Sequence, residues 1–167
     1  MTLMKTIFLL LWFLASASFT PLATAQAANT LVGTWQLVSS DNILNGKRTP
    51  IYGENPQGLT IFTADGYYMT EYIRQDLPKF ASNSRVAGTP EENKAVVQGS
   101  IASFGHYTVN DANKEIIFNI ERSTFPNWVG AVQKRAYTLV GNELRYTVLG
   151  ASTGQGSAEV VLKRVGK

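Results

Sequence analysis

The chain has 167 residues, a formal net charge of +3, one histidine and no cysteine. This length suits a single domain, and so small a charge, with no run of basic residues longer than a pair, gives no reason to expect a nucleic-acid partner. The lack of cysteine excludes disulfides, thiol catalysis and thiolate metal sites.

The N-terminus contains the three parts of a secretory signal in order. Lys5 precedes an apolar run over residues 7–14, and a short stretch of small residues precedes Gln26. The apolar run is shorter than the about 20 residues that a membrane-spanning helix needs. The sequence therefore predicts a signal peptide over residues 1–25, export to a periplasm or out of the cell, and no stable membrane anchor.

Alternating apolar residues predict strands along most of the remaining chain. The expected strands are, in chain order, residues 31–38, 58–63, 67–74, 101–109, 115–122, 129–140, 143–149 and 157–165. The Asp65-Gly66 pair suits a tight hairpin between the second and third of these strands. Residues 42–56 instead combine Asn-Gly with two X-Pro pairs, which predicts a loop with room for one short strand near Ile51.

One helix is expected to interrupt the strands. Residues 76–88 form a long excursion of the kind that often crosses a binding mouth. Thr89 is a good N-cap, Pro90 suits the first helical position, and Glu92 completes a capping box. The sequence predicts a helix of about two to three turns that ends near Gly99 and closes one end of the sheet.

Eight or nine strands with one short helix predict an all-β fold. Strands at short, regular spacing favour an antiparallel up-and-down barrel, which removes sheet edges by closing on itself. A barrel of about eight strands leaves room for one small ligand. We expect the barrel domain to span residues 31–165, after a short extension over residues 26–30.

The segment over residues 121–139 is the expected centre of a ligand site. Arg122 continues the alternation of the apolar strand before it, while Arg135 and Tyr137 continue the alternation of the strand after it. Two arginines are therefore expected to face one interior, and the alternative is that both point to solvent. The loop between them combines proline, asparagine and Trp128, which predicts a structured loop at the barrel rim.

The predicted ligand-binding residues are polar or aromatic side chains on the strands around this loop. They are Tyr72, Arg74, His106, Phe118, Arg122, Trp128, Arg135 and Tyr137. A buried guanidinium is costly without an anion, so inward arginines should pair with a carboxylate such as Glu71 or with an acidic ligand. The alternative is ordinary, because arginines at strand ends are usually solvated and tyrosines in barrels usually belong to the core.

Gly33-Thr34-Trp35 near the start and Arg164 on the last strand resemble the calycin signature, in which a basic side chain lies across the early tryptophan and joins the first and last strands. An arginine over an indole gains about 0.5–2 kcal/mol of cation–π energy. Further segments extend the resemblance in order: Phe62-Thr63-Ala64-Asp65-Gly66, Pro78-Lys79-Phe80-Ala81, Thr89-Pro90-Glu91-Glu92, Phe104-Gly105-His106-Tyr107 and Pro126-Asn127-Trp128-Val129-Gly130.

Together these segments resemble the bacterial lipocalin-like domain family over residues 31–165. The resemblance implies a barrel with a pocket, but no particular activity, because that family is mostly without an assigned one. The chain lacks the mid-chain Thr-Asp-Tyr signature, the disulfides and the C-terminal helix of secreted lipocalins. A known lipocalin ligand therefore does not transfer to this chain.

Three functions remain open on this basis. The first is an exported binding protein for a small hydrophobic or amphiphilic molecule, with room for an anionic group. The second is a cofactor-free isomerase or cyclase in which His106, Tyr72 or an acidic residue transfers a proton. The third is a packed barrel that acts through its surface. The sequence shows no metal-ligand spacing, so neither a metal nor another cofactor is predicted, and no catalytic residue is assigned.

Overall fold

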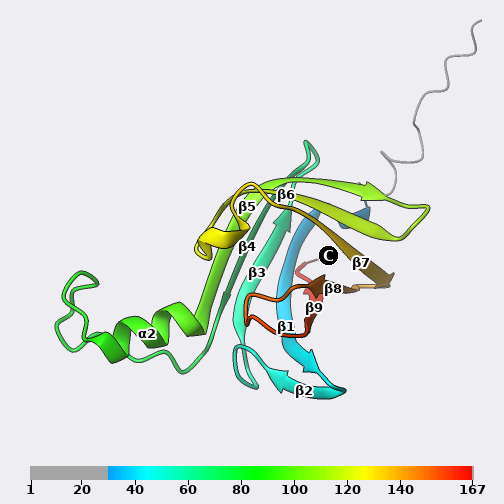
Figure 1. Cartoon of the computed structure of the whole chain (residues 1–167). Coiled ribbons are helices and arrows are strands. Elements are labelled where there is room, and N and C mark those ends of the chain that lie inside the picture. The colour runs from blue at the N-terminus through cyan, green and yellow to red at the C-terminus, as the bar shows by residue number, and fades with distance from the viewer. Residues whose placement is uncertain (1–29, 167) are drawn as a thin grey trace, which may run out of the picture.

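The computed structural model describes residues 30–166, and the predicted signal peptide lies outside this range. One antiparallel sheet runs in the order β2-β1-β3-β4-β5-β6-β7-β8-β9, and β1 also pairs with β9, which closes a barrel of eight strands (Figure 1). The strands are β1 (Gly33–Leu44), β2 (Lys47–Pro50), β3 (Gln57–Phe62), β4 (Tyr67–Ile73), β5 (Ser100–Asn110), β6 (Glu115–Ser123), β7 (Val132–Val140), β8 (Glu143–Leu149) and β9 (Ser157–Arg164). The predicted up-and-down barrel is confirmed.

The barrel interior is filled by the apolar side of each alternating strand. Its fully buried side chains include Trp35, Phe62, Tyr68, Ile116, Phe118, Ile120, Leu144, Tyr146 and Leu162. Burying one such side chain contributes about 1.5–3 kcal/mol relative to leaving it in water. The alternation that predicted the strands therefore also supplies the energy that holds the barrel closed.

Barrel closure is reinforced where the first strand meets the last. Arg164 lies opposite Trp35 in the β1–β9 ladder, with its guanidinium carbon 4.1 Å from the centre of the indole ring. The arginine Nη1 donates a hydrogen bond to the Val32 carbonyl at 2.7 Å, and the indole Nε1 donates to the Leu31 carbonyl at 2.7 Å. The structure thus has the pairing that the sequence predicted for these two side chains.

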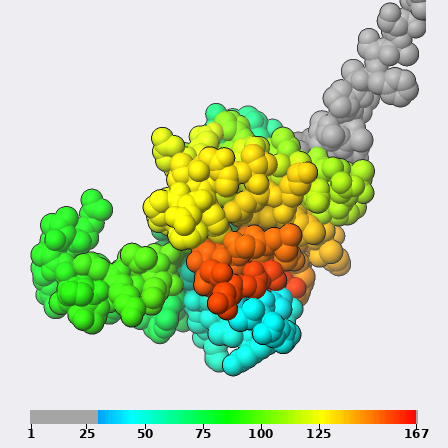
Figure 2. Space-filling view, viewed as in Figure 1, coloured from blue at the N-terminus to red at the C-terminus, as the bar shows by residue number. Residues whose placement is uncertain are grey.

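The two ends of the barrel differ in their connections. Neighbouring strands are antiparallel, so successive connections alternate between the ends. One end has the tight turns at residues 63–66, 111–114 and 141–142. The other end has the long connections, which include the helix α2 (Pro90–Gly99), the short 3-10 helix η1 (Pro126–Trp128) and the β8–β9 loop. Figure 2 shows α2 as a green projection at the left of the molecule, with the yellow segment that contains η1 and the orange segment that contains the β8–β9 loop beside it.

Helix α2 begins as the capping box predicts. The Thr89 side chain accepts a hydrogen bond from the Glu92 amide at 3.2 Å, and the Glu92 carboxylate accepts one from the Thr89 amide at 2.8 Å. The helix joins β5 at its C-terminal end and projects away from the barrel (Figure 1), with Gly99 as its buried residue. Only its last turn therefore lies at the end of the barrel. Within residues 30–166, no helix is long and apolar enough to cross a membrane.

The segment after β1 is more regular than the predicted loop. β1 continues to Leu44, and a turn at Asn45 and Gly46 leads directly into β2. Both turn residues have positive φ angles, 51° and 77°, which asparagine and glycine tolerate and which suit the twist of a hairpin. The Asn-Gly pair therefore makes a hairpin turn rather than part of a loop.

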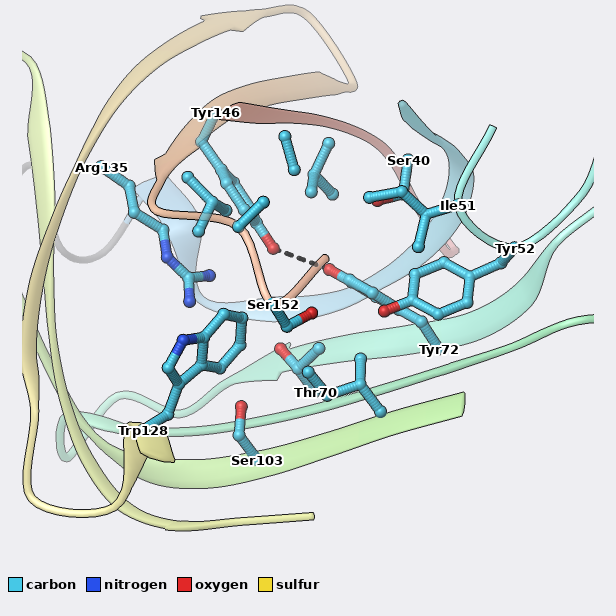
Figure 3. A pocket seen from close by; sticks show the side chains of 15 residues that line it. Ser40, Ile51, Tyr52, Thr70, Tyr72, Ser103, Trp128, Arg135, Tyr146 and Ser152 are labelled. Atoms are coloured by element: carbon cyan, nitrogen blue, oxygen red, sulfur yellow. Dashed lines mark hydrogen bonds between the residues drawn. The ribbon is translucent and has the colours of Figure 1, made fainter. Parts of the chain in front are cut away.

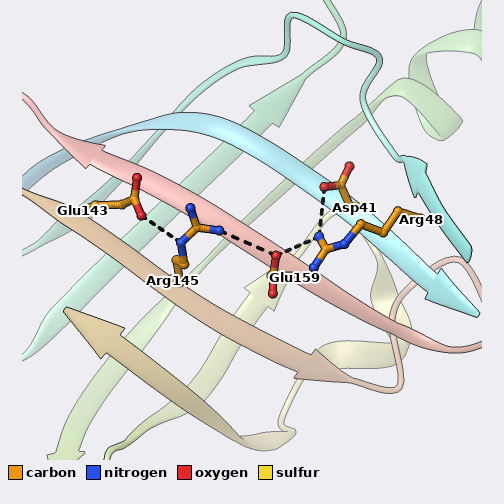
Figure 4. Close-up of polar contacts among 5 residues, drawn as sticks. All are labelled: Asp41, Arg48, Glu143, Arg145 and Glu159. Carbon is orange, nitrogen blue, oxygen red and sulfur yellow. Dashed lines mark hydrogen bonds and ion pairs between the residues drawn. The ribbon is translucent and has the colours of Figure 1, made fainter. Parts of the chain in front are cut away.

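An ion-pair network fastens the added strand β2 to the outside of the barrel (Figure 4). Arg48 Nη1 lies 2.7 Å from a Glu159 carboxylate oxygen and 3.4 Å from Asp41. Arg145 lies 3.8 Å from the same Glu159 oxygen and 2.8 Å from Glu143. The network thus joins β2, β1, β9 and β8.

Candidate functional site

An internal cavity of about 40 Å³ lies inside the barrel, toward the end with the long connections (Figure 3). Its wall combines side chains from the strands with side chains from the connections. The wall residues are Ser40, Ile51, Tyr52, Thr70, Tyr72, Ile101, Ser103, Trp128, Arg135, Tyr146, Val148, Ala151, Ser152, Ala158 and Val160. The space holds about two or three water molecules.

Arg135 brings the only formal charge to this wall. Its side chain comes from the middle of β7 and is 4% exposed. The guanidinium carbon lies 4.1 Å from the ring centre of Phe118, 5.2 Å from that of Tyr146 and 5.9 Å from that of Trp128. The Gln133 side-chain oxygen accepts hydrogen bonds from Nε at 3.3 Å and from Nη2 at 2.8 Å.

This guanidinium has no carboxylate partner among residues 30–166. Glu71, the carboxylate suggested by the sequence, is exposed on β4. Contacts with aromatic faces are each worth about 0.5–2 kcal/mol and offset part of the cost of burying the charge. Most of the N–H donors of Arg135 nevertheless remain available, so the wall presents a cation that an anion could pair with.

Hydroxyl groups form a second polar feature of the wall. Thr60 contacts Thr70 at 3.0 Å and Tyr72 at 2.7 Å, and the Tyr72 hydroxyl contacts that of Tyr146 at 2.7 Å. Burial raises the pKa of Tyr72 well above its ordinary value, and burial also raises the pKa of Tyr52. These phenols stay protonated at neutral pH, so they act as hydrogen-bonding groups and not as bases.

One further buried hydroxyl near Arg135, that of Tyr68, is without a hydrogen-bond partner. Tyr68 is 2% exposed, and within residues 30–166 its hydroxyl is the buried side-chain polar atom that has no partner. The Ser103 hydroxyl is close enough to oppose the rise in the pKa of Tyr68 that burial causes, but the two groups do not reach hydrogen-bond geometry. Ser103 itself is 5% exposed and lines the cavity. The Tyr68 hydroxyl is thus available near the guanidinium, and Ser103 lies in the same cavity wall as Arg135.

The structure brings several of the predicted site residues together. Tyr72, Trp128 and Arg135 line the cavity, and Phe118 packs beneath the guanidinium. Tyr137 also points into the barrel and is 7% exposed, but it lies outside the cavity wall and belongs to the core. The predicted loop at the rim is the 3-10 helix η1, which holds Trp128 half-buried beside Arg135.

The expectation that Arg122 faces the interior is wrong, and a β-bulge is the reason. Gly105 of β5 lies opposite Ile120 of β6, but the residue before it, Phe104, lies opposite Arg122 instead of Glu121. Glu121 is therefore an extra residue that shifts the alternation by one position. Arg122 is exposed as a result, and its Nη1 donates a hydrogen bond to the Glu121 carbonyl at 2.8 Å.

His106 and Arg74 also lie outside the cavity. His106 faces outward from β5, with its Nδ1 2.6 Å from a Glu121 carboxylate oxygen and its ring centre 4.0 Å from that of Tyr67. Arg74 is exposed just after β4 and donates to both carboxylate oxygens of Asp76, at 2.9 and 2.7 Å. Both side chains are paired at the surface, so the geometry does not support a ligand contact for either.

The sequence analysis missed twelve of the fifteen wall residues, and three of these show why. Tyr146 is in phase with the buried residues of β8, and Ser103 is in phase with the buried residues of β5, so strand periodicity could have found both. Tyr52 lies in the connection after β2, where no periodicity exists to place it. Its position depends on the tertiary packing of its ring against that of Tyr72, 6.0 Å away in an edge-to-face arrangement.

The cavity wall as a whole suits binding better than proton transfer. It contains no carboxylate and no imidazole among its side chains. Within residues 30–166, no cluster of three or more histidine, aspartate or glutamate side chains could hold a metal ion. What the wall offers is one cation, several hydroxyl groups and aromatic and aliphatic surface.

Comparisons with known proteins agree with this architecture. One curated relative is the 4'-hydroxy-3'-methoxypropiophenone carrier protein of Aspergillus oryzae, which is 26% identical over 85 residues, covering 47% of this chain and 77% of the relative. The family model of the lipocalin-like domain matches residues 32–165, the whole of the barrel. The chain therefore belongs to the lipocalin-like domain family.

Proposed function

We propose that the protein is an exported small-molecule carrier whose barrel holds an acidic amphiphile with its anionic group at Arg135. The observation that carries this proposal is the burial of Arg135 in a cavity wall without a carboxylate among residues 30–166. A buried charge without a counter-ion is costly, so a ligand that supplies an anion at this position would be favoured. A ligand carboxylate could accept two parallel hydrogen bonds from one guanidinium.

The aromatic side chains in the wall support an aromatic or otherwise apolar ligand body. Trp128, Tyr52 and Tyr72 present ring surface to the same cavity as Arg135 (Figure 3). The Aspergillus relative is named as a carrier of a substituted propiophenone, which is a small aromatic ketone. Aromatic carboxylates and fatty acids are therefore the first compounds to test, because both combine an acid with an apolar body.

The test of this function is the comparison of an acid with its own methyl ester. Calorimetric titration of the protein with a fatty acid or an aromatic carboxylate should give a tighter complex than titration with the matching ester. The ester keeps the apolar body but cannot offer an anion to Arg135. Equal affinities would contradict the anionic-ligand proposal and leave a cavity that selects by shape alone.

Export rests on the N-terminal sequence and has its own test. The proposal is supported by the basic start, the apolar run and the small residues before Gln26. Intact mass spectrometry of the protein recovered outside the cytoplasm should give a chain that begins at Gln26 or within a few residues of it. Recovery of the uncleaved chain in a membrane fraction would instead mean that the segment is an anchor.

A further inference from the structure

A larger groove lies outside the cavity at the same end of the barrel. It measures about 800 Å³ and is bounded by the last turn of α2 and the start of β5, by the end of β2 and the connection after it, by the segment before η1, and by the β8–β9 loop. Its apolar wall includes Pro50, Val96, Val97 and Phe125. Val97 is 75% exposed although it is aliphatic, so the groove leaves apolar surface in water.

The groove and the inner cavity share part of their walls. Ile51, Tyr52, Ile101 and Ser152 line both spaces. The 3-10 helix η1 connects them a second time, because Phe125 in the groove packs edge-to-face against Trp128 in the cavity, with ring centres 5.7 Å apart. The two spaces are therefore adjacent, with these shared side chains between them.

The two spaces differ in size and in chemistry. The inner cavity has about 40 Å³, which suffices for a carboxylate and little more, and it has the available donors of Arg135 on its wall and the unpartnered hydroxyl of Tyr68 nearby. The groove has about twenty times that volume, and its wall carries no charged side chain. An acidic amphiphile matches these two spaces if its carboxylate lies in the inner cavity and its apolar tail lies in the groove.

We propose that the groove is a second subsite, which holds the apolar tail of the acidic ligand while the carboxylate lies in the inner cavity at Arg135. This inference rests on the proposed function, since it requires the carboxylate at Arg135. The tail leaves the cavity between the shared wall residues Ile51, Tyr52 and Ile101 and lies along Val97 and Phe125. The ligand class is thus a monocarboxylic acid with a tail longer than the inner cavity can hold.

The test uses two acids of different length and a matched pair of substitutions. Hexanoate and dodecanoate are titrated into the unmodified protein, the Val97→Asn variant and the Val86→Asn variant. Val86 is the control, because it is 88% exposed in the loop before α2 and lies outside the groove. Both substitutions are at exposed positions, and the midpoint of urea unfolding checks that each variant remains folded.

The expected result is a loss that depends on tail length. One methylene buried from water is worth roughly fourfold in affinity, so dodecanoate should bind more tightly than hexanoate and should lose about fivefold or more in Val97→Asn. Hexanoate should change by less than about twofold in that variant, and Val86→Asn should leave both acids unchanged.

Three results would overturn the second subsite. If both acids bind more tightly than their methyl esters but Val97→Asn weakens neither, the tail lies elsewhere while the proposed function stands. If Val97→Asn and Val86→Asn weaken dodecanoate equally, the effect is not specific to the groove. If neither acid binds more tightly than its ester, the proposed function fails and the subsite fails with it.

Discussion

Two arginines pack against tryptophan rings in this barrel, and they differ in their polar partners. Arg164 lies 4.1 Å from the ring centre of Trp35 and donates hydrogen bonds to main-chain carbonyls of the segment before β1. Arg135 lies 5.9 Å from the ring centre of Trp128 and finds its polar partner in the side chain of Gln133. The first arginine ties the last strand to the segment before the first strand, whereas the second leaves most of its donors facing a cavity.

The difference teaches how to separate a structural arginine from a binding one. Main-chain carbonyl groups belong to the fold and are always present, so Arg164 is satisfied whenever the barrel is closed. Arg135 lacks a charged partner among residues 30–166 and stands at the end of the barrel with the long connections. Substitution of Arg164 should therefore mainly lower stability, whereas substitution of Arg135 should mainly weaken the binding of an acidic ligand.

The largest loss of stability is expected at Trp35. The substitution Trp35→Ala removes a fully buried ring, its hydrogen bond to the Leu31 carbonyl and the platform beneath Arg164. The free energy of unfolding should fall by about 3–5 kcal/mol, the usual range for large aromatic deletions in a core. Urea unfolding followed by circular dichroism measures this. A loss below about 1 kcal/mol would contradict the role of this ring in barrel closure.

The next largest effect on stability is expected when Arg164 is replaced by methionine. Arg164→Met should lower the free energy of unfolding by about 1–3 kcal/mol, because the carbonyl groups that it satisfies lose their partner. Its neighbour Lys163 is exposed, so Lys163→Met should change stability by less than about 0.5 kcal/mol. Equal effects of the two substitutions in urea melts would remove the case for the Trp35–Arg164 pairing.

A smaller effect is expected at Arg135, the arginine that we propose binds the ligand. Arg135→Met replaces a buried, unpaired charge by an apolar side chain of similar length. Stability should stay within about 1 kcal/mol of the unmodified protein or should rise, because burying the charge no longer costs free energy. A loss as large as that of Arg164→Met, measured in the same urea melts, would make Arg135 a structural residue and would weaken the comparison.

The smallest effect is expected for the network on the outer face, and it depends on pH. The hydrogen bond from Arg48 holds the pKa of Glu159 below its ordinary value of 4.5. A lowered carboxylate pKa stabilises the fold above the ordinary value, and this contribution is lost as the pH falls through the lowered one. Arg48→Met should therefore be less stable than the unmodified protein at neutral pH and equal to it in acid.

Acid titrations of both proteins, followed by circular dichroism, measure this difference. Because Arg48 is half-exposed, added salt should shrink the difference at neutral pH. A difference that persists unchanged into acid would show that Arg48 acts through packing and not through its charge.

The sequence contained enough information to predict most of the strands of the barrel. Alternation placed the strands, the Thr89–Glu92 capping box placed the start of α2, and Trp35 with Arg164 indicated where the first strand meets the last. These features depend on local periodicity and on short motifs. Local patterns of this kind predict the folded structure because local preference and tertiary packing favour the same conformation.

The candidate site was only partly predictable, because two of its determinants are not local. A bulge at Glu121 reverses the phase of Arg122, and nothing in the alternation of the strand signals the extra residue. The orientation of His106 was predictable, in contrast, because its neighbour Tyr107 is buried and adjacent residues of a strand point to opposite faces. Strand alternation could therefore have placed His106 on the outer face. Tyr52 reaches the cavity from a connection, where only the tertiary structure decides the position of a side chain.

The most direct test of the account is a cycle of two proteins and two ligands. The unmodified protein and Arg135→Met are each titrated by calorimetry with a fatty acid and with its methyl ester. The account predicts that the substitution weakens the acid by about 1.5–3 kcal/mol, or roughly 10- to 150-fold, while the ester is almost unchanged. An acid that binds equally well to both proteins would contradict the claim that Arg135 is kept in the barrel for an anionic ligand.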